Sequence, residues 1–186
     1  MTVMQHDIGG RPYTVEDLEG APDDGRRREL IDGVLFVSPA PGLRHQRVAL
    51  LLAMALENAC PAGLMVVPAP FSVRFSHTTE VQPDVLVARD EDLTDTLLPC
   101  APLLAVEVLS PSSALQDTTL KKSLYERMGV ASYWVIDPRE PVLDVFELTA
   151  RGSYELVSVV KGDQAFEALR PFPVRVVPVE LLGTLK

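Results

Sequence analysis

The apolar positions of the chain predict two main helices. Residues 42–58 have apolar side chains at spacings of three and four, the pattern of an amphipathic helix. A second, shorter helix is expected to open at Thr118 or Thr119 and to end at Gly129. The apolar face of this second helix consists of Leu120, Leu124 and Met128.

Short apolar runs before, between and after these helices predict strands. Asp32-Gly33 readily takes the positive φ angles of a tight turn, so residues 29–37 are expected to form a β-hairpin. Residues 142–148 and 154–160 alternate in the manner of a second hairpin. Further strand candidates are residues 64–67, 71–75, 85–87, 103–109 and 133–136.

This order of elements predicts an α+β or mixed α/β fold with a central sheet. The 186 residues contain no internal repeat and no linker, and their number is typical of a single domain, residues 1–186. Residues 1–25 are expected to be a peripheral N-terminal arm, in which Thr14 caps a short helix.

Composition narrows the class of protein. Hydrophobic residues make up 47% and charged residues 23% of the chain, which is typical of a globular protein. Cys60 and Cys100 are too few for a disulfide framework or a structural zinc site, so a reducing, cytoplasmic setting is expected. No signal peptide is visible and no apolar run approaches the roughly 20 residues of a transmembrane helix, so no membrane association is expected.

Several classes of chemistry are excluded by missing motifs. The chain has no Gly-rich phosphate loop, no G-x-G-x-x-G and no nucleophile elbow. His6, His45 and His77 are the only histidines, so a His-rich metal cage is impossible. Chemistry based on oxygen ligands remains.

Two acidic residues occur in apolar strands. Asp84 follows Pro83 at the opening of one predicted strand, and Glu107 lies inside another. Burying an isolated carboxylate costs on the order of several kcal/mol, so each must be paired, hydrogen-bonded or bound to a metal. Taken singly, Asp84 could cap a turn and Glu107 could face an edge. Together, on neighbouring strands, they would form a hard oxygen site suited to Mg²⁺.

Lysines follow on the second helix. Lys121 precedes Tyr125 by four residues, so their side chains share one helix face, and Lys122 is adjacent. A lysine over a two-carboxylate metal site can orient a hydrolytic water or neutralise a phosphorane-like transition state. A solvated helix face is the alternative interpretation.

An ordered series of motifs across residues 12–160 resembles the Uma-two type of endonucleases. Pro83-Asp84 and Glu107-Val108-Leu109 resemble the PD…(D/E)xK pattern of the wider restriction-endonuclease-like superfamily. The longer series is the more specific signal: Glu29-Leu30-Ile31-Asp32-Gly33, Ser38-Pro39, His45-Gln46-Arg47-Val48, Pro83-Asp84-Val85, Val106-Glu107-Val108-Leu109-Ser110-Pro111-Ser112, Asp117, Lys121, Tyr125, Gly129-Val130, Tyr133-Trp134 and Asp137-Pro138.

The resemblance implies a restriction-endonuclease-like core, with a central mixed sheet flanked by helices and a divalent-metal site at its edge. By position, Asp84 and Glu107 would be metal ligands, and Glu29 would add a ligand directly or through water. The superfamily has a lysine where this chain has Leu109. Lys121 matches a lysine that has moved to the following helix.

Three further residues are secondary candidates. His45 and Gln46, at the start of the first long helix, are expected to contact a phosphate or a carboxylate of the site. A histidine bonded to the backbone is the alternative for His45. Tyr125 is expected to hydrogen-bond a catalytic carboxylate, or else to pack in the core.

These residues lead to the hypothesis of a Mg²⁺- or Mn²⁺-dependent endonuclease that hydrolyses phosphodiester bonds in DNA. Asp84 and Glu107 would hold one or two ions, Lys121 would position the water or the phosphate, and Glu29 would support the metal. One alternative is a catalytically degenerate nuclease-fold module that binds a partner, because the in-strand lysine is absent. Another is a hydrolase of small phosphorylated or carboxylated substrates.

The net charge of −9 argues against tight non-specific binding to DNA. Residues 1–25 and the loop 90–95 account for the whole acidic excess, and basic residues gather near the site motifs. DNA binding is therefore expected to be weak and salt-sensitive without metal. A homodimer or higher oligomer is also expected, since nucleases of this fold that cut both strands commonly pair two subunits.

Overall fold

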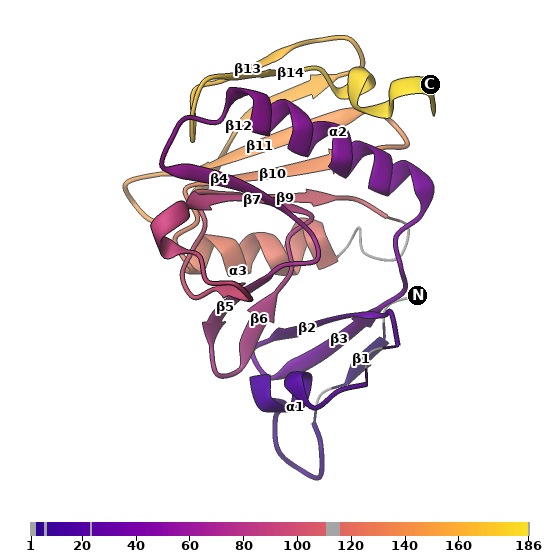
Figure 1. The fold of residues 1–186 in the computed structure, drawn as a ribbon, viewed down its shortest axis with the longest axis vertical. Helices are drawn as coiled ribbons and strands as arrows, with labels where there is room; N and C mark the ends of the chain where they lie inside the picture. The colour runs from indigo at the N-terminus through magenta and orange to yellow at the C-terminus, as the bar shows by residue number, and fades with distance from the viewer. Residues whose placement is uncertain (1–2, 6, 23, 111–115, 186) are drawn as a thin grey trace.

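The structure is a computed structural model that describes all residues except 1–2, 6, 23, 111–115 and 186. The side chains of Val3 and of residues 116–118 are also outside the described part. Pro111, Ser112 and the Asp117 side chain, which belong to the motifs above, are therefore not described. The remaining chain forms two large sheets, one above the other in Figure 1, with a long helix in front of the upper sheet.

The N-terminal sheet contains the predicted hairpin. Asp32 and Gly33 have φ angles of 50° and 80°, so the tight turn forms as the sequence predicts. This sheet has six strands among the described residues, in the order β1-β3-β2-β6-β5-β8: β1 (Val3–Gln5), β3 (Val34–Ser38), β2 (Arg27–Ile31), β6 (Thr79–Val81), β5 (Ser72–Ser76) and β8 (Leu97–Leu98).

The second sheet carries most of the predicted apolar strands. Its order among the described residues is β12-β11-β10-β9-β7-β4: β12 (Tyr154–Lys161), β11 (Val142–Leu148), β10 (Ser132–Asp137), β9 (Leu104–Val108), β7 (Val85–Arg89) and β4 (Leu64–Pro68). β9 and β10 are parallel, whereas β7 and β9 are antiparallel neighbours. A separate hairpin joins β13 (Phe166–Ala168) to β14 (Val174–Val176).

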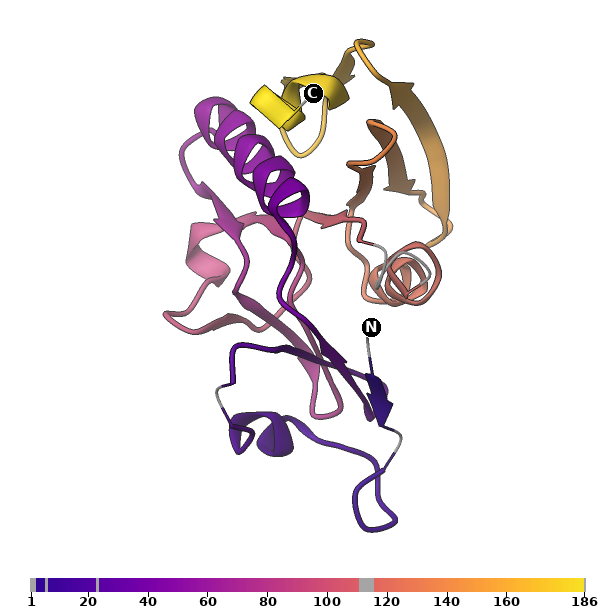
Figure 2. The ribbon, with the colours of Figure 1, turned by 90° about the vertical axis from the view of Figure 1, so that its right-hand side faces the viewer.

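Helices cover both faces of the second sheet (Figure 2). α2 (Leu43–Ala59) buries Val48, Leu52 and Leu56 against β7 side chains such as Val85 and Val87. The other helices of the described residues are α1 (Val15–Glu19), α3 (Lys122–Arg127), a π-helical segment Gln116–Lys121 that leads into α3, and the 3₁₀ segments Asp90–Asp92 and Pro178–Leu185.

α3 packs on the opposite face of the second sheet. Leu124 and Tyr125 are buried there with Leu86 of β7 and Tyr133 of β10, because neighbouring strand residues point to opposite faces. Ile31 of β2 belongs to the same apolar cluster. This shared core joins the two sheets.

The mixed α/β class is confirmed, and the structure refines the single central sheet into two. The short strands β1, β6 and β8 were not expected, because runs of two or three residues give no periodic signal. β6 pairs with both β2 and β5, so β5 belongs to the N-terminal sheet and not to the second sheet. Cys60 and Cys100 are free thiols. None of the described helices is long and apolar enough to cross a membrane.

Candidate active site

Asp84 immediately precedes β7 and lies beside Glu107 of the adjacent strand β9. The Asp84 backbone N–H donates to the Val106 carbonyl at 2.9 Å, and the Val108 N–H donates to Asp84 Oδ2 at 2.8 Å. The residues are only 3% and 1% exposed. The sequence prediction that both acids lie at neighbouring strands is therefore confirmed.

A third carboxylate comes from the other sheet. Glu29 projects from β2, and its Oε1 accepts the Gln82 backbone N–H at 2.8 Å. Its side chain is also nearly fully buried. Glu29, Asp84 and Glu107 are called the carboxylate cluster below.

Lys121 bridges two members of this cluster. Its Nζ lies 2.8 Å from Glu29 Oε1 and 2.9 Å from Glu107 Oε1, and the side chain is 1% exposed. Lys122 has a different environment, because its Nζ lies 4.1 Å from the ring centre of Phe146. The structure thus places Lys121, and not its neighbour, at the carboxylates.

Tyr125 follows one helical turn after Lys121 and reaches the same carboxylate. Its O–H donates to Glu107 Oε1 at 2.8 Å. Burial, followed by the nearby Glu107 charge, raises the pKa of Tyr125 well above its usual value, so the phenol stays a neutral donor. The shared helix face expected from the sequence therefore exists.

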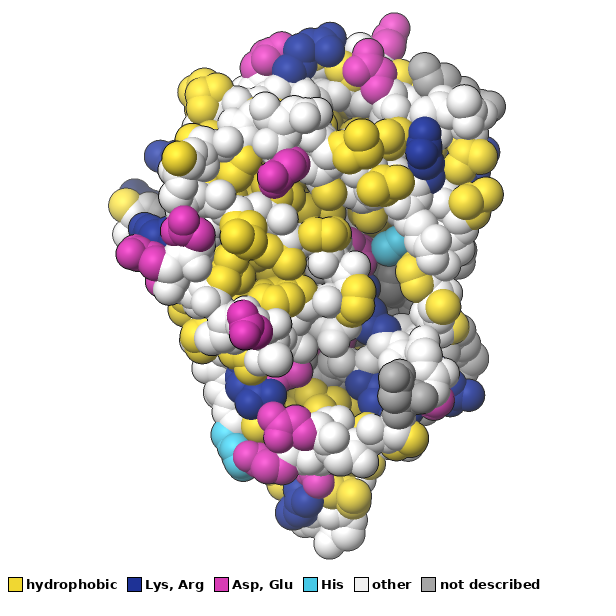
Figure 3. All heavy atoms as spheres, in the orientation of Figure 1, with side chains coloured by type: hydrophobic (Ala, Val, Ile, Leu, Met, Phe, Trp, Pro, Cys, Tyr) yellow, Lys and Arg dark blue, Asp and Glu magenta, His cyan; other side chains and the backbone are white. Residues whose placement is uncertain are grey.

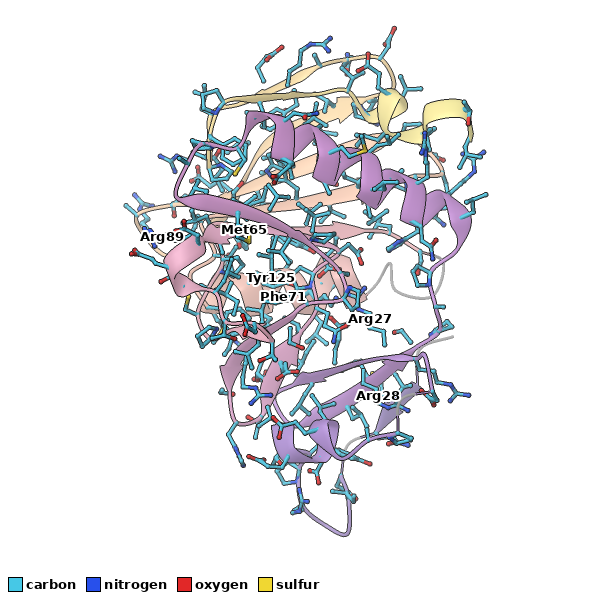
Figure 4. The ribbon with its side chains drawn as sticks, viewed as in Figure 1. Arg27, Arg28, Met65, Phe71, Arg89 and Tyr125 are labelled. Atoms are coloured by element: carbon cyan, nitrogen blue, oxygen red, sulfur yellow. The ribbon has the colours of Figure 1, made fainter. Side chains whose placement is uncertain are left out.

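Arg27 is a member of the site that the sequence analysis did not select. Its Nη1 lies 2.7 Å from Asp84 Oδ1, and its Nη2 lies 3.2 Å from Glu29 Oε1 and 3.5 Å from Glu107 Oε2. Nη2 also donates to the Gln82 carbonyl. Figure 4 shows Arg27 in the space between the two sheets. The sequence signal that could have identified Arg27 is its position two residues before Glu29 on the same strand, because such residues point to the same face of the sheet.

His45 reaches the cluster from the first turn of α2. Its Nε2 lies 3.0 Å from Asp84 Oδ2, so the histidine contacts a carboxylate as expected. An ionised carboxylate only accepts, so Nε2 carries the proton. Gln46 turns elsewhere, and its side-chain amide donates to the Pro41 carbonyl at 3.3 Å.

Buried charges in the site compensate one another. Burial raises the pKa of Asp84, but the charge of Arg27 and the hydrogen bond from His45 outweigh it and hold that pKa below its usual range. Glu29 has a lowered pKa because Arg27 and Lys121 likewise overcome the effect of burial. Both carboxyl groups are therefore ionised at neutral pH.

A cavity of about 790 Å³ gives access to this site. Arg27, His45 and Asp84 line it on the side of the cluster, and Gln46 lies at its wall. Figure 3 shows basic, acidic and histidine side chains together in a hollow of this face. Apolar side chains form much of the remaining wall, among them Leu18, Pro41, Leu50, Pro68 and Pro70.

The donor set suits a hard divalent cation. Within the described residues, no three His, Cys, Asp or Glu side chains already have the arrangement of a metal site. However, one oxygen each of Glu29, Asp84 and Glu107 contacts the single guanidinium of Arg27. Three carboxylate oxygens around one cationic group are ligands that Mg²⁺ or Mn²⁺ accepts.

The mixed α/β fold is the one that the resemblance to restriction-endonuclease-like proteins implies. The chain belongs to the Uma2 family, described as "Putative restriction endonuclease", whose model matches residues 14–180. The fold is similar to that of a "putative nuclease belonging to DUF820" from Anabaena variabilis ATCC 29413 (TM-score 0.73, 18% identity, 94% of this chain and 100% of that chain covered). No curated protein matches the chain.

Proposed function

We propose that this protein is a divalent-metal-dependent endonuclease that hydrolyses phosphodiester bonds in DNA. The observation that carries the proposal is the convergence of the carboxylate cluster and Lys121 in one buried site beside a cavity. Membership of a family of restriction-endonuclease type supports nuclease chemistry.

Asp84 and Glu107, with Glu29, would hold Mg²⁺ or Mn²⁺. When bound there, such an ion lowers the pKa of a water ligand and stabilises negative charge on the scissile phosphate. The network holds the ligand oxygens in place, since the Val108 N–H and His45 fix Asp84.

Lys121 is the proposed catalytic cation. Its ammonium donates to Glu29 and Glu107 at the distances above. This anchoring directs the charge at the carboxylate cluster, where it can orient the attacking water or a phosphate oxygen. Tyr125 is a positioning residue, because its O–H fixes the Glu107 oxygen that Lys121 also contacts.

Cleavage of supercoiled plasmid in the presence of Mg²⁺ or Mn²⁺ tests this proposal. Asp84→Asn is expected to reduce cleavage to background, and Lys121→Met to reduce it about 100-fold. Lys122→Met is the matched control and is expected to cut like the wild type, because Lys122 packs on Phe146. Equal cleavage by the wild type and both site variants would overturn the assignment.

A nuclease-fold module that binds nucleic acid without cutting it is a second candidate. The observation that favours it is the position of Arg27, which already pairs with all three carboxylates. Calorimetric titration with Mn²⁺ separates the two functions. Binding that Glu107→Gln abolishes supports the enzyme, whereas no binding by the wild type supports the module.

The proposal includes a homodimer, since one hydrolytic site cuts one strand at a time. Sedimentation velocity measures the oligomeric state directly. Linear product formed without prior accumulation of nicked plasmid would support paired sites, and a strictly monomeric protein that only nicks would contradict them.

A further inference from the structure

We propose that Arg27 is the resident cation of the carboxylate cluster in the absence of metal, and that a divalent ion binds by displacing its guanidinium into the cavity, where it contacts a phosphate of the substrate. The proposal rests on the proposed function, because it concerns the same site. It gives Arg27 two alternating partners, the carboxylates and the DNA backbone.

The guanidinium of Arg27 occupies the space between the three carboxylates. The two terminal nitrogens of Arg27 contact Glu29, Asp84 and Glu107 at 2.7 to 3.5 Å. Mg²⁺ binds carboxylate oxygens at about 2.0–2.1 Å and demands near-octahedral geometry. An ion that takes the same three oxygens therefore needs the volume that the guanidinium occupies.

The charge of the cluster favours exchange of Arg27 for the ion. The three carboxylates carry three negative charges, and Lys121 and Arg27 carry two positive ones. A divalent ion in place of Arg27 makes the three carboxylates, Lys121 and the ion neutral in sum, whereas an ion added beside Arg27 leaves one excess positive charge in a buried site. Buried charge without compensation is costly, so exchange is favoured over addition.

The guanidinium group of Arg27 has an unpaired donor and lies next to the cavity. Arg27 Nε is buried and has no hydrogen-bond partner among the described residues. An unpaired buried donor destabilises the position in which the guanidinium contacts the carboxylates. The Arg27 side chain is 19% exposed, against 1–4% for the carboxylates and Lys121, and it lines the cavity.

The destination follows from the cavity. A guanidinium released from carboxylates needs another anion, and the planar fork of arginine matches phosphate oxygens. The cavity wall beside Arg27 also contains Arg26, whose exposed side chain adds a positive charge that attracts a polyanion. Metal binding would thus create a phosphate contact at the place where the scissile bond must approach.

Modification of the wild-type protein with phenylglyoxal, mapped by tandem mass spectrometry, tests both steps. Arg27 is expected to react slowly without metal, several-fold faster with saturating Mn²⁺, and slowly again when a nuclease-resistant phosphorothioate oligonucleotide is added with Mn²⁺. Arg28, which pairs with Asp24, is expected to show no response to Mn²⁺ alone. An Arg27 rate that Mn²⁺ leaves unchanged overturns the displacement. A rate that the oligonucleotide leaves unchanged overturns the phosphate contact.

Calorimetric titration with Mn²⁺ gives an independent measurement. Arg27→Ala removes the competing cation and is expected to bind Mn²⁺ about tenfold tighter than the wild type, as for a site freed from self-occupation. Arg27→Lys keeps the charge and is expected to stay near the wild-type affinity. Arg28→Ala removes the same charge from the next residue, whose side chain is 17% exposed. This variant is expected to bind Mn²⁺ with the affinity of the wild type.

The outcomes separate this inference from the proposed function. Equal Mn²⁺ affinity of the wild type and Arg27→Ala, with binding abolished by Glu107→Gln, overturns the displacement and leaves the metal-dependent nuclease intact. No Mn²⁺ binding by any of these proteins overturns both. If Arg27→Ala does not fold, the phenylglyoxal experiment on the wild type still decides.

Discussion

Lys121 Nζ lies 2.8 Å from Glu29 Oε1, and this ion pair joins the helical segment after β9 to the N-terminal sheet. Lys121 belongs to the helical segment that follows β9, whereas Glu29 belongs to β2 of the N-terminal sheet. Both side chains are nearly fully buried, so neither charge has water as an alternative partner. The site and the packing of the two sheets therefore depend on the same contacts.

Removal of this ammonium is expected to destabilise the fold. Lys121→Met leaves Glu29 and Glu107 without one buried partner, and breaking a buried pair in this way costs about 3–5 kcal/mol. Urea denaturation at pH 7 measures the loss. The control Lys122→Met removes only a contact with Phe146 and is expected to cost no more than about 1 kcal/mol. Equal losses in both variants would show that the buried pairs contribute little.

Removal of the Tyr125 hydroxyl tests whether this residue positions Glu107 or only packs in the core. Tyr125→Phe keeps the ring against Tyr133, whose centroid is 5.2 Å away, but removes the donor to Glu107. Stability is expected to fall by about 1–3 kcal/mol, and kcat for DNA cleavage is expected to fall while KM is unchanged.

Tyr154→Phe is the matched control for this change. The Tyr154 O–H donates to the Val130 carbonyl at 2.8 Å, away from the carboxylates. Its loss is expected to affect stability but to leave kcat unchanged. A parallel fall of kcat in both variants would assign Tyr125 a structural role only.

Acid is expected to weaken the fold through the carboxylate cluster. The folded-state pKa values of Asp84 and Glu29 are lowered by Arg27 and Lys121, so the unfolded state binds more protons as the pH falls. Their stabilisation is complete above the unfolded values of about 4 and is lost as the pH falls toward the folded values.

Chemical denaturation between pH 2.5 and pH 7 measures this dependence. Asp84→Asn removes one of the two contributions and is expected to flatten the decline below about pH 4. A decline as steep as that of the wild type would show that other carboxyl groups dominate acid unfolding.

Divalent metal is expected to stabilise the protein if the cluster binds it. At a free Mn²⁺ concentration of about 100 times Kd, linkage adds about 2.7 kcal/mol to the free energy of unfolding. For a chain of this length, that corresponds to a Tm increase of about 5–11 °C. Thermal unfolding with Mn²⁺ and with EDTA measures it, and Glu107→Gln is expected to show no increase. An equal increase in that variant would place the ion elsewhere.

Local sequence signals predicted much of the secondary structure. Asp32-Gly33 forms the expected turn, and the three-four spacing of Val48 and Leu52 forms the buried face of α2. The apolar runs around Asp84 and Glu107 indicated two adjacent strands, and β7 and β9 are neighbours. These features are local because they depend on residues within one turn, one helix or one strand.

These local signals did not predict which strands belong to which of the two sheets. β6 is three residues long and contains the polar Thr79 and Glu80, yet it pairs with β2 and β5. β5 is close in sequence, but the pairing with β2 joins Leu30 to Glu80, which are far apart along the chain, and no periodicity predicts such pairing. Arg27 was missed for a similar reason, since its contact with Asp84 spans 57 residues.

The sequence by itself determined which charged residues would need partners if the fold buried them. These are two acids in apolar strands, and a lysine on the helix face that also carries Tyr125. The cost of burying a charge made partners necessary but did not identify them. Only the tertiary structure decided that Arg27 pairs with Asp84, and that Lys121 pairs with Glu29 and Glu107. The physical reason is that a buried carboxylate can be compensated by any cation that the fold brings within hydrogen-bond distance, and that choice depends on how the two sheets pack.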